Sequence, residues 1–177
     1  MNRELRSNRG ITLVELLVAL ALLSLALVVA FNIFFVSRQT FITGVDKSAV
    51  QQDARFIGNR IANELRFAKE VSTSTIAGEK HFRLDLDQHD VTNNLYRVKI
   101  TEYSAAGNIE STSYVGNYVI QDGVTYTTGG TSKNVIDFTI NATTGNQSFP
   151  VESSVKLMNV FANIPNGTTT IYYTLYE

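Results

Sequence analysis

The sequence has 177 residues, with 15 lysines and arginines against 16 aspartates and glutamates, so its formal net charge is −1. It contains no cysteine, which excludes a disulfide framework, a thiolate nucleophile and a thiolate metal site. The first ten residues hold three arginines and one glutamate; without them 12 basic and 15 acidic residues remain, a balance of −3 that does not favour a nucleic-acid-binding surface.

A long apolar run dominates the N-terminal part of the chain. Residues 16–36 include no charged side chain. As a helix this run is about 31 Å long, which is the thickness of a bilayer core. The roughly 140 residues outside the run and its basic leader suit one compact domain. We therefore expect one membrane-spanning helix and one domain.

Two interpretations of this N-terminus leave Glu15 unexplained. A secretory signal has an apolar core of roughly 7–15 residues and then a small-residue cleavage site, whereas this run is longer and no such site follows it. A plain single-span anchor fits the length, but a carboxylate at the edge of a membrane helix costs on the order of 1–3 kcal/mol. Arg38 and Lys47 after the run nearly balance the three arginines before it, so flanking charge sets the orientation only weakly.

A third interpretation accounts for Gly10, Ile11 and Glu15 together. A basic leader that ends in glycine, then an apolar residue, then a glutamate four residues later resembles the class III signal of type IV prepilins and pseudopilins. The resemblance implies that a prepilin peptidase removes residues 1–10 by cutting between Gly10 and Ile11, and that Ile11 becomes N-methylated. The family more often has phenylalanine where Ile11 stands.

The same resemblance implies a location and partners. The chain is expected as a single-pass cell-membrane protein with its head outside the cytoplasm, and then as part of an extracellular or periplasmic filament. The implied partners are other pilin or pseudopilin subunits, the prepilin peptidase and an assembly platform in the inner or cytoplasmic membrane. No cofactor and no direct nucleic-acid binding are expected.

Glu15 has a physical role in this interpretation. Removal of the leader creates a positive α-amine on Ile11, and Glu15 of one subunit can meet the amine of the next, which offsets the cost of burying both charges. Glu15 also lies in the first helical turns, where the helix dipole favours an anion. We interpret Glu15 as the residue that sets the register between neighbouring subunits. In a lone anchor its side chain would only extend towards the lipid headgroups.

A helical pattern continues beyond the apolar run, through residues 37–71. Apolar residues recur at gaps of three and four, as one stripe on an amphipathic helix: Val50, Ala54, Ile57, Ile61, Leu65 and Ala68. We predict a single helix from about Ile11 to Val71, with 11–36 in the membrane and the stripe of 37–71 packed on a globular domain. This segment further resembles PilW-type minor pilins and the J-type pseudopilins of secretion and competence systems.

Residues 72–177 have the composition of strands and turns. Period-two alternation appears in "HFRLDL", "LYRVKI", "VIDFTI", "SVKLMNVFA" and "TIYYTLYE", with glycine- and asparagine-rich turns between these runs. We expect six or seven antiparallel strands that cover the helix stripe with one face. The predicted fold class is therefore α+β, a long N-terminal helix packed on an antiparallel β-sheet head, as in pilins.

Few residues of the head suggest site chemistry. Asp85, Asp87 and Asp90 form a weak calcium candidate, although the segment lacks the glycine and distal glutamate of an EF-hand loop; an acidic turn after a strand is the alternative. His81 and His89 have no serine or carboxylate at a catalytic spacing, so no enzyme is expected.

Two surface features complete the candidates. A local basic face formed by Arg83, Arg97 and Lys99 stays open as a nucleic-acid contact. In the last strand, alternation places Tyr173 on the core side and Tyr172 and Tyr176 on the other face, where an aromatic contact surface or an ordinary half-exposed strand is possible.

The predicted function is a structural subunit of a type IV pilus-like filament, processed after Gly10 and assembled through its N-terminal helix. The head is larger than that of a minimal pilin, which favours a minor pilin or pseudopilin. The alternatives are a major pilin and a non-polymerising single-span membrane protein with an exported binding domain. Twitching or adhesion, DNA uptake and protein secretion all stay open as the process served.

Overall fold

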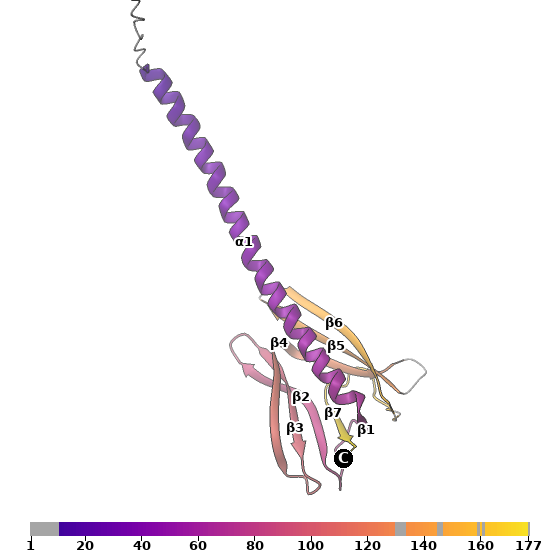
Figure 1. Ribbon diagram of the computed structural model, residues 1–177. Helices are drawn as coiled ribbons and strands as arrows, with labels where there is room; N and C mark the ends of the chain where they lie inside the picture. The colour runs from indigo at the N-terminus through magenta and orange to yellow at the C-terminus, as the bar shows by residue number, and fades with distance from the viewer. Residues whose placement is uncertain (1–10, 130–133, 145–146, 159, 161, 177) are drawn as a thin grey trace, which may run out of the picture. The chain divides into compact units, whose positions relative to one another are not determined.

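The computed structural model describes residues 11–129, 134–144, 147–158, 160 and 162–176. Two compact units make up the chain, Met1–Val45 and Asp46–Glu177. One helix is followed by seven strands: α1 (Leu13–Arg66), β1 (Ala68–Ser72), β2 (His81–Asp90), β3 (Leu95–Tyr103), β4 (Ile109–Thr128), β5 (Val135–Thr144), β6 (Gln147–Lys156) and β7 (Ile171–Leu175). The helix packs on the antiparallel sheet, so the predicted α+β, pilin-like fold class is confirmed (Figure 1).

The helix ends earlier than predicted. It stops at Arg66 rather than at Val71, and β1 starts at Ala68. The helical spacing of the stripe misled the prediction, because Ala68 and Val71 are indeed buried, but as strand residues that pair with Leu175 and Tyr173 of β7. Hydrogen bonding to a distant strand therefore overrides the helical periodicity.

The sheet runs in the order β1-β7-β2-β3-β4-β5-β6. The C-terminal strand β7 lies between β1 and β2 and pairs with both. The end of the chain is therefore hydrogen-bonded to the first strands of the second unit. Strand β4 is shared along its length: its first part pairs with β3, its second part pairs with β5, and Val119 pairs with both Tyr96 and Ala142. The change of partner comes with a register shift between Val119 and Val124, at a positive φ of 52° on Asp122.

One predicted strand is wrong in its bounds. The segment "SVKLMNVFA" was expected to alternate as a strand, but β6 ends at Lys156. Leu157 is buried and donates its N–H to the carbonyl of Asn134, whereas Met158 is 65% exposed. Further on, the carbonyls of Thr168 and Ile164 accept the N–H groups of Tyr126 and Thr128 of β4, and the Ile164 N–H donates to the Thr128 hydroxyl.

The core lies between the second part of α1 and one face of the sheet. Every residue of the predicted stripe is buried, with at most 1% of its surface exposed: Val50, Ala54, Ile57, Ile61, Leu65 and Ala68. Sheet side chains face them, among them Leu84, Ile140 and Tyr173. Gly58 lies on the same packed face, and a Cβ there would be in ordinary van der Waals contact with Ile140 at 3.5 Å. The amphipathic pattern thus identified the packed face correctly.

A second contact fixes the helix to the bend of β4. Gly116 has a φ of 80°, and a Cβ at this position would overlap the side chain of Ile57. The chain bulges here, and the carboxylate of Asp53 accepts hydrogen bonds from the N–H groups of Asn117 (2.8 Å) and Tyr118 (3.2 Å). A helix side chain therefore satisfies the amides that the bulge leaves without a strand partner.

Candidate functional site

The predicted processing site is only partly within the described residues. Gly10 and the leader of residues 1–10 lie outside them. Ile11 is described, is not helical and is 77% exposed. Ile11, whose amino group the predicted cleavage would free, therefore lies on non-helical backbone, one residue before Thr12.

Thr12 and Glu15 close the start of α1 as a capping box. The carbonyl of Thr12 accepts the N–H of Leu16 at 3.1 Å, and its Oγ1 accepts the N–H of Glu15 at 3.3 Å. In return, Oε2 of Glu15 accepts the Thr12 N–H at 2.9 Å and the Thr12 hydroxyl at 3.0 Å. This reciprocal pattern satisfies amide donors that the first helical turn would otherwise leave free. The prediction placed Glu15 in the first turn but missed Thr12, although the Thr-x-x-Glu spacing was visible in the sequence.

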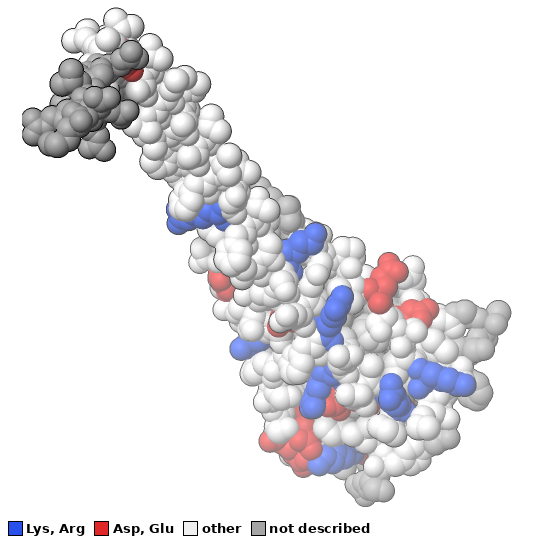
Figure 2. All heavy atoms as spheres, turned by 45° about the horizontal axis from the view of Figure 1, so that its top comes forward, with Lys and Arg blue, Asp and Glu red and all other residues white. Residues whose placement is uncertain are grey.

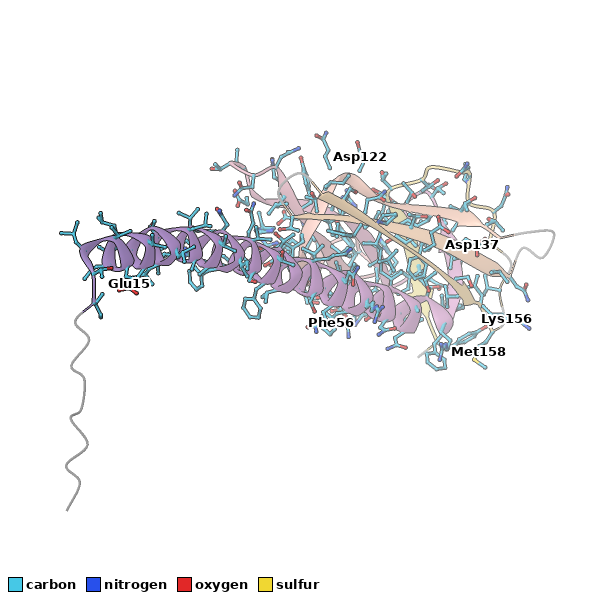
Figure 3. All side chains as sticks on the ribbon, turned by 90° about the horizontal axis from the view of Figure 1, so that it is seen from above. Glu15, Phe56, Asp122, Asp137, Lys156 and Met158 are labelled. Atoms are coloured by element: carbon cyan, nitrogen blue, oxygen red, sulfur yellow. The ribbon has the colours of Figure 1, made fainter. Side chains whose placement is uncertain are left out.

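The helix that follows has no cover within its own unit. Every residue of 13–45 is exposed, and Glu15 and Arg38 are its only charged residues. By length and composition α1 can cross a membrane, and the most apolar window of the described helix is 0% buried. Figure 2 shows the helix in white between a red area at its beginning and a first blue area further along, and Figure 3 places Glu15 at this beginning. A large exposed apolar surface is typical of sites that contact a membrane or another protein.

The weak calcium candidate is not supported by the structure. Asp85 forms an ion pair with Arg83 at 2.7 Å, and Asp87 pairs with Arg97 at 2.9 Å. Asp90 instead accepts hydrogen bonds from the backbone and side chain of Asn93. Across the described part of the chain, no group of three His, Asp or Glu side chains could hold a metal ion. Each of the three carboxylates thus has a partner of its own.

The environments of these carboxylates differ. Burial raises the pKa of Asp85, and the charges of Arg83 and Lys99 oppose this shift. Hydrogen bonds from the side chain and backbone of Asn93 lower the pKa of Asp90, which is partly exposed. Asp90 therefore stabilises the β2–β3 turn in its ionised form, which corresponds to the acidic-turn alternative.

The two histidines have different surroundings. His81 is buried, stacks on Tyr103 with ring centroids 5.0 Å apart, and its Nδ1 lies 3.0 Å from the carbonyl oxygen of Glu79. His89 Nε2 lies 2.8 Å from the carbonyl oxygen of Asn117. Each ring is thus oriented by a backbone carbonyl, and among the described residues neither hydrogen-bonds to a carboxylate or a hydroxyl.

The basic face is compensated by acidic neighbours. Arg83 and Arg97 are both engaged in the ion pairs just described, and Lys99 lies opposite Asp85 in the β2–β3 register. The guanidinium of Arg97 also lies 3.6 Å from the ring centroid of Tyr114. Alternating signs give this face little net positive potential, which weakens the case for phosphate binding.

The C-terminal tyrosines are placed as the alternation predicted. Tyr173 is fully buried and donates its hydroxyl to Oε2 of Glu64 at 2.9 Å, while Tyr176 is 57% exposed. Tyr176 lines a pocket of about 610 Å³ with Lys69, Glu79 and Lys80. Both lysines are paired there, Lys69 with Glu79 at 2.8 Å and Lys80 with Glu102 at 2.6 Å. Because a glutamate already neutralises each of these two lysines, they do not form a ready binding site for an anion.

Comparison with known proteins identifies the N-terminal segment. The family model described as "Prokaryotic N-terminal methylation motif" matches residues 5–31. No curated protein and no solved structure matches the chain. The match includes Gly10, Ile11 and Glu15, so the resemblance predicted from these residues is confirmed for this segment.

Proposed function

The N-terminal methylation motif supports a place for this chain in the type IV prepilin and pseudopilin family, and from that premise we propose that it is a structural, non-enzymatic subunit of a type IV pilus-like filament. A prepilin peptidase cuts between Gly10 and Ile11, Ile11 is N-methylated, and the mature chain assembles through α1. Before assembly the chain spans the cell membrane once, with Asp46–Glu177 outside the cytoplasm.

One observation carries this proposal: residues 13–45 are helical and exposed throughout, residues 16–36 among them carry no charge, and a hydrogen-bonded carboxylate stands at the beginning of the helix. In water this surface would be strongly unfavourable, since each buried apolar side chain contributes about 1.5–3 kcal/mol. A bilayer can cover the helix first and neighbouring helices of the same kind can cover it afterwards. Glu15 then meets a donor of the neighbouring subunit.

We further propose a minor pilin or pseudopilin rather than a major pilin. The Asp46–Glu177 unit supports this choice, because seven strands and a long β4 form a head larger than a minimal one. A single-span membrane protein that does not polymerise is the second candidate, and the exposed apolar helix fits it equally well as an anchor.

Intact mass spectrometry of the protein from its native host, with separation of membrane and sheared-filament fractions, tests the proposal. We expect a mass reduced by residues 1–10 and increased by one methyl group, in both fractions. The Glu15→Ala variant should be absent from the filament fraction, because its helix lacks the intersubunit charge. An uncut chain, or a mature chain found in the membrane alone whatever residue stands at position 15, would contradict filament assembly.

A further inference from the structure

A small pocket lies where β7 begins. The pairing of β7 with β2 ends at Leu84, because Ile171, the first residue of β7, is its partner. The chain just before Ile171 contacts β4 instead, since the carbonyl of Thr168 accepts the N–H of Tyr126 at 2.7 Å. A pocket of about 210 Å³ lies beside β2 at this end of the pairing, and its lining includes Arg83, Asp85, Tyr96, Asp122, Thr169 and Thr170.

The ion pair between Arg83 and Asp85 leaves one atom of each side chain without a partner. Nη2 of Arg83 lies 2.7 Å from Oδ2 of Asp85. Among the described residues, however, nothing hydrogen-bonds to Nε of Arg83 or to Oδ1 of Asp85, although both atoms are buried. A buried polar atom without a partner loses the hydrogen bond that water gives it in the unfolded chain. The pair therefore holds one donor and one acceptor for a group from outside the chain.

A neighbouring ion pair shows a more complete arrangement. Arg97 of β3 donates from both Nε and Nη2 to Oδ2 of Asp87 of β2, at 3.0 and 2.9 Å. This guanidinium uses the Nε that has no partner in Arg83, and neither Arg97 nor Asp87 lines the pocket. The incomplete pairing is therefore a feature of the pocket and not of every arginine–aspartate pair on these strands.

The composition of the pocket selects a class of ligand. The guanidinium and the carboxylate of the pair neutralise each other, so a metal ion would meet Arg83, and an anion would meet Asp85 and Asp122, each at an electrostatic cost. The hydroxyls of Thr169 and Thr170 add neutral donors and acceptors. The volume of about 210 Å³ is below the roughly 300–1,000 Å³ typical of sites for drug-sized ligands. These features favour a small neutral ligand that carries both donors and acceptors.

We propose that this pocket binds one neutral sugar residue. Each hydroxyl of a sugar is both a donor and an acceptor, so two adjacent hydroxyls can accept from Nε of Arg83 and donate to Oδ1 of Asp85. The ring of Tyr96 offers an apolar surface in the same pocket. The side chain of Arg83 is 37% exposed, which leaves its guanidinium room to turn towards the ligand. This binding is a property of the second unit and does not depend on filament assembly.

Amide NMR spectra of the isotope-labelled full-length chain, in a detergent without a sugar headgroup, test the proposal. The probes are D-glucose, D-galactose, D-mannose and N-acetyl-D-glucosamine, added one at a time. Glycine, inorganic phosphate and calcium chloride represent a zwitterion, an anion and a metal ion. We expect at least one sugar to shift the amide signals of Asp85, Asp122, Thr169 and Thr170 in a saturable way, and the charged probes to leave these signals unchanged.

A double variant removes the ion pair without leaving a buried charge behind. In Arg83→Met/Asp85→Leu both ionic groups are replaced by apolar side chains of similar size, a change that buried ion pairs generally tolerate. Asp87→Leu/Arg97→Met is the matched control, because it removes the pair that lies outside the pocket. We expect the first variant to lose the sugar-induced shifts and the second to keep the wild-type affinity. Thr170→Val removes one hydroxyl at nearly constant shape and should lower the affinity about fivefold, the factor that one neutral hydrogen bond contributes.

Three outcomes would overturn the inference: no saturable shift with any of the sugars, shifts confined to residues outside the pocket, or equal sugar binding in the two double variants. Binding of glycine, phosphate or calcium in place of a sugar would overturn it as well, since the pocket would then serve a charged ligand. If Arg83→Met/Asp85→Leu gives no dispersed amide spectrum, Thr170→Val decides, and an unchanged affinity there contradicts the proposal. None of these results bears on the proposed function, which is tested by processing and by the filament fraction.

Discussion

The two parts of α1 use the same helix in opposite ways. Residues 13–45 are almost entirely apolar, yet all of them are exposed; residues 46–66 carry seven charged side chains, yet six of their residues are buried: Val50, Ala54, Ile57, Gly58, Ile61 and Leu65. Hydrophobicity alone therefore does not decide burial. The second part finds its partner in the sheet of its own chain, and the first part requires one from outside.

The difference is also one of pattern. In residues 46–66 a narrow stripe at gaps of three and four meets one surface, and Figure 3 shows Phe56 on the opposite side of the helix, away from the sheet. Residues 16–36 are apolar on nearly all sides, as expected of a helix that is surrounded rather than covered on one face. The period of the pattern thus reports how many sides of a helix will be covered.

Matched truncations in the two parts give the largest expected difference. Ile57→Ala removes a fully buried side chain and should lower the free energy of unfolding of the second unit by about 3 kcal/mol. Leu23→Ala, at a position that is 56% exposed, should leave it unchanged. Denaturant unfolding of the detergent-extracted chain, followed by near-UV circular dichroism, measures both. Equal losses would mean that residues 13–45 contribute to the fold of the head.

A charge placed in each part tests the membrane side of the comparison. Leu25→Lys puts an ammonium near the centre of the apolar run, at a cost of roughly 3 kcal/mol for membrane insertion. Ala49→Lys adds the same charge at an exposed position of the second unit and should have no effect. Alkaline carbonate extraction of membranes distinguishes them: the first variant should shift to the soluble fraction. Retention of Leu25→Lys at the level of the control would argue against a spanning helix.

The smallest effect concerns the contact between the helix and the last strand. Tyr173→Phe removes the donor to Glu64, which keeps its pair with Arg60 at 2.7 Å, and should cost about 1–2 kcal/mol. Burial, and then the charge of Glu64, raise the pKa of Tyr173 above that of a free tyrosine. A raised folded-state pKa stabilises the fold below about pH 10 and this stabilisation is lost as the pH rises further.

Unfolding free energies measured between pH 8 and pH 11 test this prediction. The alkaline loss of stability should be smaller in Tyr173→Phe than in the wild type, and Tyr176→Phe, at an exposed position, should behave as the wild type. An unchanged alkaline slope in Tyr173→Phe would mean that other groups, such as the equally buried Tyr126, govern the transition.

Much of the site was predictable because its signals are local. Gly10, Ile11 and Glu15 are close together in the sequence, and so is the Thr12 that closes the capping box. The carboxylates of the weak calcium candidate depend on contacts that are not local. Asp85 and Asp87 are near each other in the chain, but alternation with Arg83 and pairing with Arg97 of β3 give each carboxylate a separate cation. Strand pairing decides such partners, and sequence spacing does not reveal it.

By itself the sequence determined the class of the protein: a processing motif, a helix long enough for a membrane, an amphipathic continuation and a strand-rich head. These follow from composition and from periods of 3.6 and 2, which depend only on local backbone geometry. Only the tertiary structure decided that the helix ends at Arg66, that β7 lies between β1 and β2, and that Asp53 satisfies the bulge of β4. A period identifies the face that is buried, whereas the partner that buries it is chosen by hydrogen bonds and packing between residues far apart in the chain.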